Sequence, residues 1–195
     1  KIKSLSISGR NGDITAAGAM KIGQNYNLTI GGKIDLAPLK ALTKTIEFLK
    51  GDGEFAIEIS GHWKSPELKG EINIRDGAVM LAGLPYKIDS IDGNIFLDKH
   101  RITFDSFNAD FAGGRVAASG VGYLEGLSLK RLFISSEMEG IRFRPVEDVD
   151  VAFDGRLFFE TSPKRQNLIG EINIKKAKYG KRVEWKSWLL RLMEI

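Results

Sequence analysis

The sequence predicts a mainly β protein built as an antiparallel meander. Several segments alternate apolar and polar residues with a period of two, which is the periodicity of a strand with one buried face. Glycine-containing turn dipeptides recur along the chain and suggest that strands connect to their neighbours. The 195 residues include 22 glycines and five prolines, which suits a fold with many turns better than a helix bundle.

The alternation predicts strands at residues 54–60, 68–75, 151–159 and 171–175. In the first of these, Phe55, Ile57 and Ile59 alternate with charged or small residues. Because successive side chains of a strand point to opposite faces, each segment has an apolar and a polar face. A sheet of such strands is apolar on one side and solvated on the other.

Hairpin turns are expected where residues that tolerate positive φ occur in pairs. The pairs are Asn11-Gly12, Asp52-Gly53, Asp76-Gly77, Asp92-Gly93, Asp154-Gly155 and Gly113-Gly114. Local turns of this kind favour a meander over parallel βαβ units.

Two segments have helical spacing. Over residues 36–50, Asp35 is placed to cap the first turn and Gly51 to end the helix. The stretch 183–194 places two tryptophans and two leucines on one face, with basic residues around it. That second helix either faces the core or caps the trough, or its apolar face rests on a membrane interface or a partner protein.

An internal repeat near 52–75 and 154–175 supports the prediction that residues 1–195 form a single segment of a larger repetitive protein. The pentapeptide Gly-Glu-Ile-Asn-Ile occurs at 70–74 and again at 170–174, each time after an Asp-Gly pair. Repeats of this kind usually stack into one continuous core or groove. The chain begins at Lys1, so we expect a longer parent.

The composition argues against several classes of function. The net charge is +4 without a dense basic block, so a nucleic-acid partner is not expected, and the absence of cysteine excludes thiol chemistry. His62 and His100 lack ligand spacing, and the acidic cluster Glu147, Asp148 and Asp150 lacks a calcium-loop pattern. We therefore expect no enzyme activity, no metal and no cofactor.

Several segments, in order, resemble the AsmA-like/TamB superfamily of bacterial envelope proteins, which are bridge-like lipid transfer proteins. They are residues 27–36 (NLTIGGKIDL), 53–61 (GEFAIEISG), 65–70 (SPELKG) and 88–98 (IDSIDGNIFLD), followed by 101–104 (RITF) and the hairpin at 113–120. Together they cover most of residues 14–175, and the last twenty residues match less clearly.

The resemblance implies a fold, a place and a task. The fold is an elongated antiparallel sheet curled into an open trough, or β-taco. The place is the periplasm of a Gram-negative bacterium, in a parent anchored in the inner membrane. The task is phospholipid transport between the inner and outer membranes. The alternative is a periplasmic scaffold that assists outer-membrane protein assembly by strand pairing, with an outer-membrane β-barrel protein as a partner of the parent.

An apolar groove that carries phospholipid acyl chains needs a continuous lining and no specific side-chain chemistry. The same alternation would equally describe the filled core of a sandwich. We call the expected lining residues the lining set: Phe55, Ile57, Ile59, Ile72, Ile74, Ile95, Leu97, Ile102, Phe104, Val151, Phe153, Leu157, Phe159, Ile172 and Ile174.

Overall fold

The computed structural model describes residues 2–21, 23–42, 44–146 and 149–180. They form eleven strands and one short 3-10 helix, η1. The elements are β1 (Ile2–Gly9), β2 (Gly12–Met20), β3 (Asn25–Asp35), η1 (Ala37–Leu42), β4 (Ile46–His62), β5 (Ser65–Leu81), β6 (Ile88–Lys99), β7 (Arg101–Phe111), β8 (Gly114–Glu125), β9 (Ser128–Val146), β10 (Val149–Ser162) and β11 (Arg165–Tyr179).

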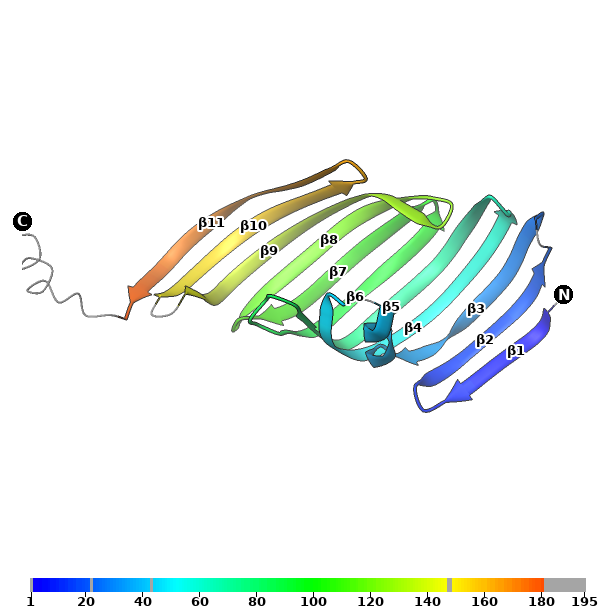
Figure 1. Cartoon of the computed structure of the whole chain (residues 1–195), viewed down its shortest axis with the longest axis horizontal. Coiled ribbons are helices and arrows are strands. Elements are labelled where there is room, and N and C mark those ends of the chain that lie inside the picture. Colours follow the sequence, from blue (N-terminus) through cyan, green and yellow to red (C-terminus); the bar gives the residue numbers. More distant parts are fainter. Residues whose placement is uncertain (1, 22, 43, 147–148, 181–195) are drawn as a thin grey trace, which may run out of the picture.

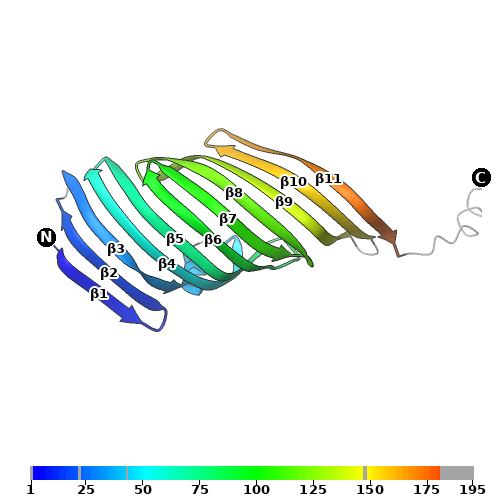
Figure 2. The same ribbon diagram turned by 180° about the vertical axis from the view of Figure 1, so that it is seen from behind.

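All eleven strands belong to one sheet in which spatial order follows chain order. Each strand pairs antiparallel with its sequence neighbours, and β1 and β11 are the two open edges. Figures 1 and 2 show the sheet from its two sides, with the N-terminus at one edge and β11 at the other. The predicted mainly β, open, curled sheet is therefore confirmed.

The prediction of a helix over residues 36–50 is wrong for the second half of that range. The 3-10 helix η1 ends at Leu42, and β4 begins at Ile46. The cap was correctly identified, since the Ala37 N–H donates to Oδ1 of Asp35 over 2.8 Å. Ile46 and Leu49 lie on a strand and pair with β5, so packing against the sheet outweighs their helical spacing. The helix predicted at 183–194 lies outside the described residues.

The four Asp-Gly pairs do not form turns, which is a second correction. Asp52-Gly53, Asp76-Gly77, Asp92-Gly93 and Asp154-Gly155 all lie inside strands. In each case a bulky side chain lies over the glycine. A Cβ added to Gly93 would lie 2.6 Å from Cγ of Phe107, and one added to Gly155 would lie 3.1 Å from Cε of Met138. These glycines are there to admit a neighbouring side chain.

Irregular positions interrupt the ladders of the middle strands. The register shifts beside Gly51 in β4, Asp76 in β5, Ser90 in β6 and Ser106 in β7, and each of these residues has a positive φ. A β-bulge bends its strand and increases the local twist. Bulges in four consecutive strands therefore help to curl the sheet.

The two copies of the pentapeptide occupy corresponding places in two hairpins. Residues 70–74 lie in β5, the returning strand of the β4–β5 hairpin, and 170–174 lie in β11, the returning strand of β10–β11. Membership in a larger repetitive protein stays a prediction.

Candidate functional site

One face of the sheet is apolar from edge to edge, and we call it the apolar face. Directly opposed residues in a sheet point to the same side. The register places Phe55 opposite Ile72, Ile72 opposite Ile95, and Ile95 opposite Phe104, so one apolar row crosses β4 to β7. The same row continues from Phe104 to Gly120 in β8, to Ile134 in β9 and to Phe159 in β10.

All members of the lining set lie on this face, because the pairings connect them without a change of side. The sequence pattern had predicted one common side for them.

Sequence reasoning missed a comparable number of apolar residues on the same face. They include Ile7, Ile14, Leu28, Ile30, Ile34, Leu49, Val79, Phe107, Phe111, Leu132, Ile134, Ile141 and Phe143. The alternation of Leu28 and Ile30 was a usable signal. Phe107 gave none, because the bulge at Ser106 shifts its parity relative to Phe104.

The apolar face is shielded in the middle of the sheet and open towards its edges. Leu97 in β6 is 7% exposed and Ile141 in β9 is 0% exposed. Near the β11 edge, Ile172 and Ile174 are 57% and 60% exposed. Among the described residues, no second sheet covers this face, and η1 is the one helical element that lies over it (Figure 1).

At the upper end, hairpin tips approach one another across the curl. Here the upper end is the one with the turns near residues 64, 100 and 126. The Leu124 N–H donates to the carbonyl of His100 over 2.7 Å. The tip residue Gly126 reaches the β4–β5 hairpin, since its Cβ position lies 3.7 Å from the Lys64 carbonyl and 3.9 Å from Cδ of Pro66. This contact bridges over the β6–β7 pair, so the sheet is curled towards the apolar face here.

At the lower end, the loop between β5 and β6 crosses to β9. Tyr86 in this loop packs its ring against Phe111 (5.9 Å between centroids) and Phe143 (5.4 Å). Its hydroxyl oxygen accepts the backbone N–H of Arg144 over 3.0 Å. The loop therefore ties one flank of the trough to another that lies three strands away.

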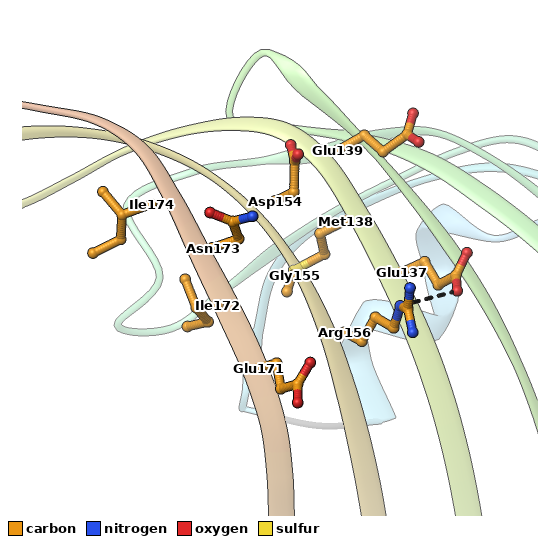
Figure 3. A pocket seen from close by; sticks show the side chains of 10 residues that line it. All are labelled: Glu137, Met138, Glu139, Asp154, Gly155, Arg156, Glu171, Ile172, Asn173 and Ile174. Carbon is orange, nitrogen blue, oxygen red and sulfur yellow. Dashed lines mark ion pairs between the residues drawn. The ribbon is translucent and has the colours of Figure 1, made fainter.

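The opposite, polar face carries most of the charge and several hollows. One of about 830 Å³ lies over β9, β10 and β11 and is lined by charges of both signs (Figure 3). Arg156 and Glu137 pair across it with 3.6 Å between Nε and Oε1. The pKa of Asp154 is lowered by hydrogen bonds from the Gly140 N–H and the Lys175 ammonium. A general acid needs the opposite shift.

The polar face also carries an exposed apolar cluster. Phe133, Phe158 and Ile169 border a hollow of about 470 Å³ together with serine, threonine and asparagine side chains. Phe158 is 55% exposed and Ile169 is 68% exposed. The alternation did not predict which side of the sheet Phe158 and Ile169 face, and no sequence signal identified the cluster.

The two histidines lie at hairpin tips, His62 at the end of β4 and His100 between β6 and β7. Nδ1 of His62 accepts the Lys64 N–H over 3.2 Å, and Nε2 of His100 lies 3.4 Å from the Ser65 hydroxyl. Within the described ranges, no three His, Asp or Glu side chains are grouped in a way that would hold a metal ion.

The helices in that part of the chain include none that is long and apolar enough to cross a membrane.

What the arrangement offers chemically is a wide hydrocarbon surface on one side of a thin, well-solvated sheet.

A scan against protein-family models, a search of the curated proteins and a search of the solved structures each found no match for the chain.

Proposed function

We propose that this segment shields phospholipid acyl chains on its apolar face while they move between the inner and outer membranes. The observation that carries the proposal is the unbroken apolar face, which continues through all eleven strands and has no covering layer among the described residues.

The size of the hydrophobic effect makes such a surface useful. Exposing a CH₂ group to water costs about 0.8 kcal/mol, so a chain of about sixteen carbons costs on the order of 10 kcal/mol to expose. Side chains such as Phe55, Ile72 and Phe104 offer apolar contact without directional bonds. A carrier that lacks strong directional contacts releases its cargo readily.

The partial exposure of the apolar face also supports a carrier. A filled sandwich core would bury its inward side chains on both sides of the interface. Among the described residues the buried hydrophobic side chains are Ala78, Leu97 and Ile141, whereas most large side chains of the apolar face keep some contact with solvent. Surface of that kind calls for an apolar ligand or partner.

The resemblance to the AsmA-like/TamB superfamily supplies the setting of the proposal. In that setting the parent is anchored in the inner membrane, and this segment lies in the periplasm of a Gram-negative bacterium. It acts as a binding surface and not as an enzyme, without a cofactor. The described strands agree with the β-taco that the resemblance implies, in their order and in their open edges.

The test is site-specific photo-crosslinking in cells that produce the full-length parent. A photoreactive residue replaces Ile72, Ile102 or Phe159 on the apolar face, and Glu71, Thr103 or Glu160 serves as the matched neighbour on the polar face. We expect phospholipid adducts at the first three positions and none at the controls. Equal labelling of both faces, or no lipid at either, would refute the proposal.

A second candidate function is the scaffold for outer-membrane protein assembly, favoured by the open edge of β11. Among the described residues no strand pairs with the outer side of β11. An unpaired edge is able to accept a client strand by backbone hydrogen bonding. In the same experiment, protein adducts at Ile169 and Asn173 without lipid adducts at Ile72 would favour this alternative.

A further inference from the structure

The lower ends of β9, β10 and β11 carry a concentration of positive charge that the carrier function does not use. We call it the basic end and define it as Arg142, Arg144, Lys175, Lys176 and Lys178. Four of these residues, together with Asp150 and Ala152, border a hollow of about 580 Å³. In Figure 1 it lies towards the tip of the β11 arrow.

The strand register separates two cations by one small residue. Arg142 in β9 is opposite Ala152 in β10, and Ala152 is opposite Lys176 in β11. Neighbouring strands lie about 4.8 Å apart, so the backbones of the two basic residues are about 10 Å apart. The methyl group of Ala152 leaves the space between them unfilled, which suits an anionic group of the size of a phosphate.

Two nearby carboxylates among the described residues, those of Asp150 and Asp154, are already engaged with other cations. Asp150 accepts from Nε of Arg144 over 2.7 Å, and Oδ2 of Asp154 lies 3.1 Å from Nζ of Lys175. Asp150 is also opposite Lys178 in the register. Within the described part of the chain, Arg142, Lys176 and Lys178 form no ion pair.

The upper end of the same face has a different charge pattern. There Glu58, Lys69, Asp98 and Arg101 follow one another across β4 to β7, so that opposite charges alternate. Charges arranged in this way largely neutralise each other. The excess of positive charge is therefore a local property of the basic end.

The other side of the basic end is apolar and carries an exposed tyrosine. Val151 is opposite Phe143, and both lie on the apolar face. Tyr179 is opposite Val149 and is 61% exposed. Lysine and arginine beside an exposed tyrosine and hydrocarbon are the residue types found where proteins meet the head-group layer of a bilayer.

We propose that the basic end docks on the anionic phospholipid head groups of a bilayer surface. If the proposed function holds, this contact also brings one end of the apolar face to the membrane from which lipid enters or leaves. A nucleic acid would match the charge, but it would leave Ile172, Ile174 and Tyr179 exposed to water next to the contact. The combined charge and hydrocarbon favour a membrane.

The test is flotation of the whole chain with vesicles of phosphatidylcholine alone or with added phosphatidylglycerol. The unchanged chain is expected to float with the anionic vesicles only, and less at high salt. The triple variant Arg142→Gln, Lys176→Gln, Lys178→Gln should bind on the order of 100-fold more weakly, because each basic residue near an anionic surface contributes several-fold. Circular dichroism checks that each variant keeps its β content.

A matched triple variant separates the site from net charge. Lys69→Gln, Arg101→Gln and Arg131→Gln also remove three positive charges from a chain of net charge +4, but at the upper end. This variant should bind anionic vesicles nearly as well as the unchanged chain. Equal losses in the two triple variants would show that only total charge matters and would overturn the proposal.

A single substitution tests the space between the cations. Ala152→Glu introduces a carboxylate between Arg142 and Lys176 and should weaken vesicle binding severalfold, whereas Ala152→Gln adds the same bulk without the charge and should not. Equal effects of the two would count against the docking site.

The remaining outcomes distinguish other ligands. If duplex DNA binding depends on Arg142, Lys176 and Lys178 and vesicle binding does not, the partner is a nucleic acid and the proposal is overturned. Displacement of the chain from vesicles by inorganic phosphate at low millimolar levels would also overturn it. The result is independent of the carrier function. If the chain does not bind vesicles but Ile72 still crosslinks to lipid, the docking proposal fails and the carrier function is retained. If the chain binds vesicles but Ile72 does not crosslink to lipid, the carrier function fails and the docking proposal is retained.

Discussion

The carboxylate of Asp154 in β10 accepts the backbone N–H of Gly140 in β9 over 2.9 Å. Gly140 has a φ of 65° and is skipped by the pairing of β9 with β10, so its amide is not used by that ladder. Asp92 in β6 does the same for Asp76 in β5, over 3.2 Å. In both cases an aspartate on one strand satisfies an irregular amide on its neighbour, which stabilises the irregularity.

Replacement of Asp154 by alanine should loosen this irregular position. Without the carboxylate the Gly140 amide loses its acceptor and should exchange with solvent deuterium faster, while amides in β2 and β3 should not change. The measurement is hydrogen exchange followed by mass spectrometry or NMR. Asp52→Ala is the matched control, because Asp52 also precedes a strand glycine but its carboxylate accepts no bulge amide among the described residues. Faster exchange at Gly140 in both variants would argue against a specific bond.

The stability of the protein should depend on pH through Asp150 and Asp154. The pKa of Asp150 is lowered from 3.8 mainly by the hydrogen bond from Arg144, and the pKa of Asp154 by those from Gly140 and Lys175. A carboxyl group with a lowered folded-state pKa stabilises the fold above its unfolded pKa and loses that contribution as pH falls through the folded value.

The double variant Asp150→Asn, Asp154→Asn should therefore be less stable than the unchanged chain at pH 7. The difference in stability between the variant and the unchanged chain should become smaller as pH falls below 3.8, where the unchanged chain also loses its two charges. Urea midpoints measured across this range check the expectation. A gap of constant size from pH 7 to the acid limit would contradict it.

Gly93→Ala should destabilise the sheet through a steric conflict with Phe107. The added methyl group would lie 2.6 Å from Cγ of that ring, and overpacking of this kind costs about 1–3 kcal/mol. The free energy of unfolding in urea measures the effect. In a Phe107→Ala background the same change should cost much less. Gly9→Ala is the control, since nothing lies within 4 Å of its Cβ position and its φ is not positive.

Truncation of the apolar face should have different effects at its middle and at its edge. Ile141 is fully buried, so Ile141→Ala should cost about 2–5 kcal/mol of folding free energy. Ile174 is 60% exposed, and Ile174→Ala should cost less than about 1 kcal/mol. Urea denaturation of the two variants gives the comparison. Similar large losses at both positions would mean that the β11 side of the face is covered in solution.

The loop that contains Tyr86 should open when its hydroxyl contact is removed. Tyr86→Phe deletes the acceptor for the Arg144 N–H and should cost about 1 kcal/mol, and Tyr86→Ala should also lose the ring contacts with Phe111 and Phe143. Limited proteolysis should then cut within residues 82–87 sooner. Tyr179→Phe, at a 61% exposed tyrosine, should leave the cleavage rate unchanged.

Local sequence patterns were reliable for the faces of regular strands. The alternation of Phe55, Ile57 and Ile59 correctly assigned one apolar side, because side-chain direction in a strand depends only on parity. The same reasoning failed beyond Ser106, where one additional residue in a bulge reverses parity and moves Phe107 onto the apolar face. Bulges depend on the partner strand, so period counting along one strand does not reveal them.

The Asp-Gly pairs show the same limit. Taken alone, Asp92-Gly93 has the composition of a tight turn. In the structure the aspartate accepts an amide of β5 and the glycine lies beneath Phe107 of β7, so both residues serve strands that are distant in sequence. The helical spacing of Ile46 and Leu49 was likewise outweighed by pairing with β5.

By itself, then, the sequence determined an open-ended series of amphipathic antiparallel strands, because alternation and short connections are local properties. The tertiary structure decided where the strands bend, how the tips at Lys64 and Gly126 meet, and that Arg142 and Lys176 flank Ala152. Those features arise from register between strands, and register depends on contacts between residues that are far apart in the chain.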